Sequence, residues 1–190
     1  QREEMSWAFW AHDMRACPVY HTGYYKTVIK VLQCFCWGCG RLKLDPLTHP
    51  KMLEARNKRG AARLKCVYDA SKGVHRRCGG DKRRRDEDDL RDQLVSSGCG
   101  KAFPNVINMT GRNNQPGSVE IQVEEFNEGD DRGVGGFKRK LYAKEAYDAL
   151  YKLETDLSRL EILGFDHRYT RPSWMIIQVL PVPPPQVRPL

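Results

Sequence analysis

The stretch from Gln33 to Gly40, Gln-Cys-Phe-Cys-Trp-Gly-Cys-Gly, holds three of the seven cysteines of the chain. Cys36 and Cys39 form a Cys-x-x-Cys motif, with a glycine on each side of the second thiol. A tight turn of this kind brings two sulfur atoms to one point, and glycine relieves the crowding there. The motif therefore predicts one half of a tetrahedral metal site.

Two cysteines further along the chain have the same kind of neighbours. Cys78 is followed by two glycines, and Cys99 lies between two glycines. The spacing favours a single structural zinc site, and we predict that its ligands are Cys36, Cys39, Cys78 and Cys99. Because the second pair is not a Cys-x-x-Cys motif, spacing alone leaves two alternatives open, namely buried or redox-active thiols and disulfides.

The composition limits the class of protein. A chain of 190 residues with 40% hydrophobic residues is sufficient for one large domain or two small ones with a real core. Seven is an odd number of cysteines, so complete disulfide pairing would leave one unpaired. The charged start of the chain is unlike a secretory leader, and no apolar run is long enough to span a bilayer. We therefore expect a reducing, intracellular compartment, which favours metal binding over disulfides.

The charge of the chain suggests an acidic partner. The formal net charge is +8, and nucleic acid is the commonest partner of so basic a protein. The alternative is a basic surface that is simply solvated. Within residues 79–97, the mixed run of basic and acidic residues from 81 to 89 favours a solvated, mobile loop over a phosphate contact.

Hydrophobic periodicity predicts three helical regions. One follows the turn at Gly23 and leads into the cysteine motif. A second spans residues 51–70, with candidate inward positions that include Leu53, and is broken at Gly60. The third spans residues 143–163, where Thr155 is expected to be the N-cap between two helices.

Other segments predict strands. Residues 118–124 alternate strictly between apolar and polar, and residues 137–141 are expected to return as the partner strand of a hairpin, 118–141, across a flexible loop at 127–136. Residues 174–180 suggest a buried strand, which the prolines from 181 onward end in an extended segment. The chain is therefore expected to be α+β.

No catalytic or cofactor-binding residue is predicted. The chain lacks a Gly-x-Ser-x-Gly elbow, a His-Glu-x-x-His motif and clustered metal-binding aspartates. His21 is expected to be a hydrogen-bonded, partly buried residue, although a ligand or proton-carrier role is the alternative. Cys66, among apolar helical neighbours, is interpreted as a core thiol.

The end of the chain carries a resemblance to a known family. Residues 168–189, with Arg-Pro-Ser-Trp-Met-Ile and then Leu-Pro-Val-Pro-Pro and Val-Arg-Pro, resemble a pattern in the largest subunit of multisubunit RNA polymerases. The subunit of eukaryotic RNA polymerase II is the most similar. Three upstream pieces, residues 18–24, 30–39 and 98–100, resemble that family's Pro-Val-Phe-His-Val-Gly-Phe, Lys-Val-Leu-x-Cys-x-Cys-x-x-Cys and Gly-Cys-Gly in the same order. The resemblance covers roughly residues 14–189.

This resemblance implies the clamp region near the N-terminus of that subunit. It places a clamp zinc ion on the same four cysteines that the spacing favours. It also implies a clamp-like domain over residues 18–190, with a zinc knuckle at 34–39, a closing strand and a proline-rich segment at 171–190, and a separate N-terminal segment at 1–17.

The chain departs from the family pattern at two places. The family carries an additional zinc motif, with Gly-His-Phe-Gly-His, before the residues that match 18–24, whereas Cys17-Pro18 here runs directly into Val19. We therefore predict an internal deletion, a single zinc ion and no ligand role for Cys17. In addition, Ser173 stands where the family usually has glutamate.

The function implied by the resemblance is mechanical. The clamp of such polymerases helps to retain template DNA and the RNA–DNA hybrid, so we expect a nuclear protein without a membrane partner. The expected partners are DNA, the hybrid, other polymerase subunits (especially the second-largest), and initiation and elongation factors. The catalytic Mg²⁺ of the full polymerase is held by an aspartate triad that this chain lacks, so we expect no nucleotidyltransferase activity from the chain alone. The alternative is a free-standing zinc-dependent nucleic acid-binding or regulatory module.

Overall fold

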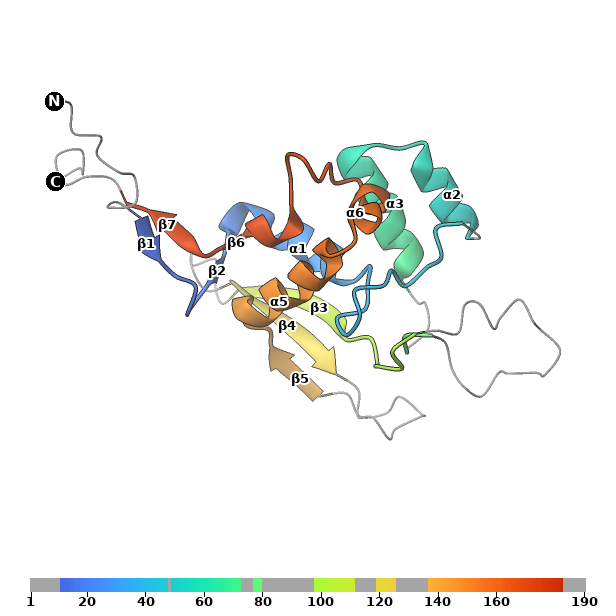
Figure 1. Ribbon diagram of the computed structural model, residues 1–190. Helices are drawn as coiled ribbons and strands as arrows, with labels where there is room; N and C mark the ends of the chain where they lie inside the picture. Colours follow the sequence, from blue (N-terminus) through green and yellow to red (C-terminus); the bar gives the residue numbers. More distant parts are fainter. Residues whose placement is uncertain are drawn as a thin grey trace, which may run out of the picture.

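The computed structural model describes residues 11–47, 49–72, 77–79, 98–111, 119–125 and 137–182. Helices and small antiparallel sheets alternate along the chain, as expected for an α+β fold (Figure 1). The helical elements are the 3₁₀ turn η2 (Thr22–Tyr24), α1 (Tyr25–Leu32), α2 (Pro50–Arg56), α3 (Gly60–Ser71), α5 (Ala143–Glu154), α6 (Leu157–Leu163) and the 3₁₀ turn η4 (Pro172–Met175).

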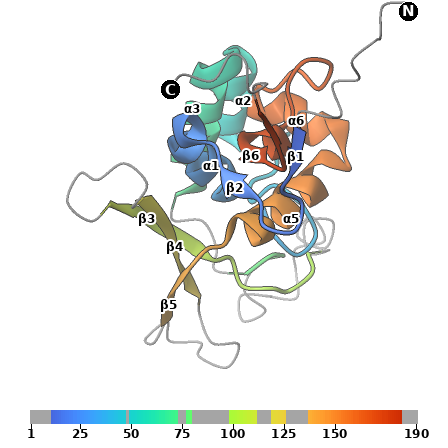
Figure 2. The same ribbon diagram turned by 90° about the vertical axis from the view of Figure 1, so that its left-hand side faces the viewer.

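The strands form three separate antiparallel sheets in the described residues. They are β1 (Ala11–Asp13), β2 (Val19–Tyr20), β3 (Asn105–Gly111), β4 (Val119–Glu125), β5 (Phe137–Lys140), β6 (Ile176–Ile177) and β7 (Val179–Pro181). The largest sheet has the order β3-β4-β5, while β2 pairs with β6 and β1 pairs with β7. The β1–β7 pair extends from the helices as an arm, and the three-stranded sheet projects on another side (Figures 1 and 2).

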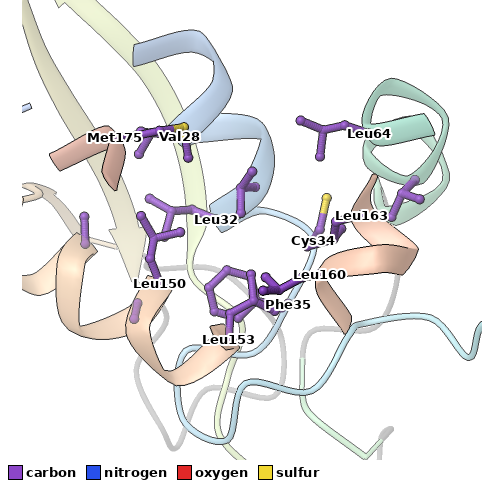
Figure 3. Packing of buried hydrophobic residues seen from close by; sticks show 14 of the residues in the cluster. Val28, Leu32, Cys34, Phe35, Leu64, Leu150, Leu153, Leu160, Leu163 and Met175 are labelled. Atoms are coloured by element: carbon purple, nitrogen blue, oxygen red, sulfur yellow. The ribbon is translucent and has the colours of Figure 1, made fainter. Parts of the chain in front are cut away.

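The core lies between helices α1, α3, α5 and α6 and one face of the sheet. Val28 and Leu32 on α1 recur at helical spacing and are fully buried, as are Leu150 and Leu153 on α5. Figure 3 shows Leu32, Leu150 and Leu153 near Phe35, which lies three residues after the end of α1. Burial of each such side chain contributes about 1.5–3 kcal/mol to the free energy of folding.

Arg63 on α3 connects three helices at the edge of this core. Its guanidinium group donates to the carbonyl oxygens of Ala55, Arg56 and Lys58 at the end of α2, at distances of 2.7–3.1 Å. It also donates to the carbonyl oxygen of Glu161 on α6, at 2.7 Å. The last carbonyls of a helix lack partners within the helix, so this arginine satisfies groups that would otherwise need water.

The predicted hairpin is part of a larger sheet. Strands β4 and β5 pair as expected, but β4 also pairs with β3, a strand that was not predicted from the sequence. The register of β3 against β4 shifts between Val106 and Asn108. Such an irregularity interrupts the alternation of apolar and polar residues, which is the sequence signal of a strand.

The prediction of one closing strand over residues 174–180 is wrong. The chain forms η4 first, and Trp174 in that turn is 62% exposed. Two short strands follow, of which β6 pairs with β2 and β7 pairs with β1. The apolar run from Trp174 to Leu180 is thus divided between a turn and two sheets because its pairing partners, near the start of the chain, are themselves short.

Some predictions about individual helical residues also need correction. The N-cap of α6 is Asp156, whose carboxylate accepts a hydrogen bond from the backbone N–H of Ser158 at 3.1 Å, whereas Thr155 ends α5. Leu53, predicted to face the core, is exposed. Gly60 does separate two helices, since it begins α3 after the end of α2.

Several predicted loops lie outside the described residues. These are the charged loop 79–97 apart from position 79, the loop at 127–136, and most of the proline-rich end. Of the N-terminal segment 1–17, the described part contributes β1.

Candidate metal centre

The first half of the candidate site is a tight turn that begins just beyond α1. The Sγ atom of Cys34 contacts the Lys30 carbonyl oxygen at 3.0 Å, and Phe35 forms an antiparallel bridge with Leu42. Within this bridge, the backbone N–H of Cys36 donates to the carbonyl of Arg41 at 2.8 Å. Because residues 34 and 35 are buried in the main core, the turn is fixed to the helices while the side chains of Cys36 and Cys39 remain free to bind.

Helices α5 and α6 hold the outside of this turn. Lys152 on α5 donates to the carbonyl of Trp37 at 3.3 Å, and Arg159 on α6 donates to the carbonyl of Cys39 at 3.4 Å. Gly40 has a φ angle of 72°, and a Cβ atom there would lie 2.6 Å from the carbonyl oxygen of Lys152. Only glycine fits this backbone conformation and this close approach without strain.

The second half of the site repeats the same pattern with residues from two separated segments. Arg77 and Ala102 form an antiparallel bridge, and the backbone N–H of Cys78 donates to the carbonyl of Lys101 at 2.9 Å. The segments also touch at Gly98, where a Cβ atom would lie 2.3 Å from the backbone nitrogen of Gly79. Glycine at position 98 therefore allows the two segments to meet.

The two halves bring four thiols together. The Sγ atoms of Cys36 and Cys99 are 3.4 Å apart, those of Cys39 and Cys78 are 3.6 Å apart, and all four sulfurs lie within 4.8 Å of one another. Four sulfurs around a tetrahedral zinc ion, with Zn–S bonds of about 2.3 Å, are separated by about 3.8 Å. The described residues contain no other group of histidine, cysteine and acidic side chains arranged to hold a metal ion.

The pKa shifts of these thiols are also consistent with a binding site for a cation. Burial raises the pKa of the Cys36 thiol, and burial likewise raises the pKa of the Cys78 thiol. Burial acts in the same direction at Cys39, but the backbone N–H of Arg41 and hydrogen bonds from the neighbouring thiols outweigh it and lower the pKa of Cys39 to about 7. Four adjacent thiols cannot all ionise without a positive charge among them, and a bound metal ion supplies that charge.

The other described cysteines and histidines lie apart from this cluster. Cys34 is buried in the core, Cys17 is exposed, and Cys66 is partly buried against the core, with its sulfur 3.6 Å from the Lys51 carbonyl oxygen. His21 is exposed rather than partly buried, and its Nδ1 atom accepts a hydrogen bond from the backbone N–H of Gly23 at 3.1 Å.

Comparison with known proteins places the chain in a family. A family model described as RNA polymerase Rpb1, domain 1, matches residues 11–190. The chain belongs to the Rpb1 domain 1 family. A curated relative in Euplotoides octocarinatus, named DNA-directed RNA polymerase II subunit RPB1, is 31% identical over 178 residues, which are 94% of this chain. The aligned part covers 34% of that relative, so the chain spans about a third of its length.

The Rpb1 match agrees with the resemblance found in the sequence. It covers all four clustered cysteines, the β1–β7 and β2–β6 pairs and the described end of the chain. The missing motif between Cys17 and Val19, and with it the internal deletion, stays a prediction.

The structure adds features of this Rpb1 domain that the motifs alone did not show. The backbone groups of Arg41 and Lys101 orient the two turns. Lys43 is partly buried beside the site, with its Nζ atom 4.9 Å from the centre of the Phe103 ring, and burial lowers its pKa. Because Lys43 lies only four residues after Cys39, the short spacing could have drawn attention to it, although its burial depends on tertiary packing.

No helix in the described part of the chain is both long enough and apolar enough to cross a membrane.

Proposed function

We propose that this chain is the zinc-stapled clamp part of the largest subunit of DNA-directed RNA polymerase II. In this role it helps to retain template DNA and the RNA–DNA hybrid, in the nucleus, in contact with the second-largest subunit and other components of the polymerase. The observation that carries the proposal is the convergence of four sulfur atoms from two distant segments in a chain whose sequence matches the Rpb1 family.

The proposed ligands of the zinc ion are Cys36, Cys39, Cys78 and Cys99. Four thiolates are the usual donor set of a closed structural zinc site, with no open position for a substrate. The zinc ion, when bound, supplies a crosslink between residues far apart in the chain. The role of the protein residues is to orient the thiols through the two backbone turns and to exclude water by packing Phe103 against Cys36 and Cys78.

A stiff, basic domain suits the retention of nucleic acid. Lysine and arginine side chains attract phosphates without reading the base sequence, which is what a protein needs if it must hold any transcribed template. The net charge of +8 supplies the attraction. We assign no chemical step to the chain itself.

The first test is the metal content of the purified chain. We expect one zinc ion per chain, and its loss in Cys36→Ser and in Cys99→Ser, because each variant removes a ligand from one half of the site. Cys66→Ser is the matched control, since this partly buried thiol lies outside the cluster. A chain that folds without zinc, or that keeps zinc in both ligand variants, would contradict the proposed site.

The second test concerns assembly. If the chain is a part of the polymerase, we expect it to co-purify with the second-largest subunit when both are co-expressed, and to lose this partner when Cys99 is replaced by serine. Stable nucleic acid binding by the isolated chain, with no binding to polymerase subunits, would instead favour the free-standing module.

A further inference from the structure

The described residues do not carry positive charge evenly. Helices α1 and α3 lie against each other, and together they contain one acidic residue, Asp69. Lys26 and Lys30 on α1, Lys65 on α3, and Lys72 at the end of α3 are basic. We call these four residues the lysine face.

The lysine face points away from the core. On α1, the buried side chains are Val28, Val31 and Leu32, and Lys26 and Lys30, one turn apart, fall on the opposite side of the helix. On α3, Lys65 and Lys72 are exposed, whereas Leu64 and Val67 are buried. The two solvent-facing sides meet where the helices pack, so the lysines form one surface.

Asp69 shows that three of the four lysines, Lys30, Lys65 and Lys72, gather around one point. Lys72 donates a hydrogen bond to the Asp69 carboxylate at 3.0 Å, and this bond is the main reason that the pKa of Asp69 is lowered. Lys65 and Lys30 contribute further through their charge, which places lysines from both helices near one carboxylate. Lys72 also lies 4.3 Å from the centre of the Tyr68 ring. Asp69 is the one acidic residue on α1 and α3, and one carboxylate cannot neutralise four ammonium groups, so within the described residues these helices present a net positive charge.

Several exposed lysines elsewhere in the structure lie near a carboxylate group that offsets their charge. Lys140 forms an ion pair with Glu120 at 2.6 Å, and Lys144 forms one with Asp148 at 3.5 Å. Lys138 is directly opposite Glu124 in the register of β4 and β5. Lys140 and Lys144 are thus paired with carboxylates and Lys138 has one across the strand, whereas on the described parts of α1 and α3 four lysines accompany a single carboxylate.

A basic cavity at the other end of α3 is a weaker candidate. It has a volume of about 600 Å³ and is lined by Arg59, Arg63 and Arg168. However, Glu161 and Asp166 line it as well, Arg168 is paired with Asp166 at 2.9 Å, and Arg63 is occupied by backbone carbonyls. Little free positive charge remains there for a ligand.

We propose that the lysine face, Lys26, Lys30, Lys65 and Lys72, binds the phosphodiester backbone of nucleic acid without base specificity. The proposal rests on the proposed function, and it identifies the surface through which the chain contacts nucleic acid. Lysine is a point charge on a flexible stem, which suits phosphates in varying positions. Arginine pairs bidentately with carboxylates and phosphates in a fixed geometry, but the one arginine on α1 or α3, Arg63, is already bound to carbonyl oxygens. The face therefore offers charge without a fixed geometry, as backbone contacts that do not read the base sequence require.

The test compares two variants of the complete chain with equal charge. The face variant carries Lys26→Gln, Lys30→Gln, Lys65→Gln and Lys72→Gln. The control variant carries Lys51→Gln, Lys138→Gln, Lys140→Gln and Lys144→Gln, which removes the same charge from lysines that have a carboxylate nearby. Circular dichroism and zinc content establish that both variants fold.

Binding is measured by fluorescence anisotropy with a DNA duplex of about 20 base pairs and with an RNA–DNA hybrid of the same sequence, between about 50 and 200 mM KCl. We expect at least a roughly tenfold loss of affinity for both probes in the face variant at the lower salt concentration. The slope of log affinity against log salt should also decrease by about 0.9 for each phosphate that the variant no longer neutralises. The control variant should show a loss of less than about threefold.

The possible outcomes separate this inference from the proposed function. Equal losses in the two variants, or no loss in the face variant, would overturn the lysine face while leaving nucleic acid binding by the chain intact. No binding by the unmodified chain would overturn both the face and the nucleic acid part of the proposed function. Equally tight binding of a polyglutamate peptide at the same face would identify an acidic protein segment as the partner and would also overturn the proposal.

Discussion

The helical core and the metal centre of this chain are stabilised by different means. Among the residues that the structure describes, the main cluster contains 23 buried residues from α1, α2, α3, α5, α6, the sheet and neighbouring segments, whereas the cluster at the metal centre contains three, Cys36, Cys78 and Phe103. The core can exclude water by packing alone. Of the described residues beside the thiols of Cys78 and Cys99, 77–79 and 98–103, Cys78 and Phe103 are buried, so we expect the position of this part to depend on backbone hydrogen bonds and on the proposed metal ion.

The turn at residues 36–40 connects the helical core to the metal centre. Cys34 and Phe35 belong to the core, while the next residue, Cys36, belongs to the metal centre. One half of the proposed zinc site is therefore preformed by the core, and the other half must be brought to it. A metal crosslink contributes most where the chain alone provides few contacts.

Removal of the metal should change the structure most, and it should affect the metal centre more than the helical core. When zinc is removed with a chelator, we expect backbone amides at residues 77–79 and 98–103 to lose hydrogen-exchange protection, while amides in α1, α5 and α6 keep most of theirs. Hydrogen exchange with mass spectrometry measures both regions in one sample. A uniform loss of protection would show that the core depends on the metal as well, and the distinction between the two regions would fail.

A cavity made in the core by mutation should have the next largest effect, a decrease in the free energy of unfolding. Leu150→Ala removes a fully buried side chain, and we expect the free energy of unfolding to fall by about 2–5 kcal/mol. Leu157→Ala, at a leucine that is 47% exposed, is the control and should change it by less than about 1 kcal/mol. Denaturant titration of the zinc-loaded chain measures both. Comparable losses in the two variants would mean that packing around α5 does not stabilise this region as described.

The segments of Cys78 and Cys99 touch at Gly79 and Gly98 in the second half of the metal centre. A substitution at this contact should change the metal centre and leave the helical core unaffected. In Gly98→Ala the new methyl group would overlap the backbone of Gly79, so we expect a loss of zinc affinity equivalent to about 1–3 kcal/mol. Gly23→Ala is the control, because a Cβ atom there meets its nearest neighbour, the His21 ring, at 3.4 Å. Competition with a zinc chelator measures the affinities. An unchanged affinity in Gly98→Ala would show that the two segments can separate without disturbing the thiols.

The helix cap at Asp156 should have the smallest effect, and that effect should depend on pH. Asp156→Ala removes the N-cap of α6, and we expect a loss of about 1 kcal/mol at pH 7, while Asp156→Asn, which keeps the acceptor oxygen but not the charge, should lose less. Hydrogen bonds from Ser158 lower the pKa of Asp156 from its usual 3.8, so the stabilisation by its charge is present above about pH 4 and is lost as the pH falls through the lowered value. Thermal unfolding at pH 7 and pH 3 measures this. A loss that does not diminish at pH 3 would argue against a contribution of the carboxylate charge.

Local patterns predicted the elements whose signals lie within one segment. The periodic apolar residues of α1 and α5, the break at Gly60 and the alternation of β4 were all visible in the sequence. The same four cysteines that spacing favoured are brought together by the structure, because glycines beside thiols mark the tight turns that such sites need. Strand β3 was missed because its irregular register disturbs the alternation, and the N-cap was misplaced by one residue because Thr155 and Asp156 are both good caps.

The sequence by itself determined the helices of the core, the candidate ligands and the family resemblance, since each depends on residue type and spacing. Only the tertiary structure decided how those pieces meet: the pairing of β1 with β7 and of β2 with β6, the contact of Gly98 with Gly79, and the gathering of lysines from α1 and α3 around Asp69. The physical reason is that these contacts join residues far apart in the chain. Their partners are selected by the packing of the whole core, which no local pattern encodes.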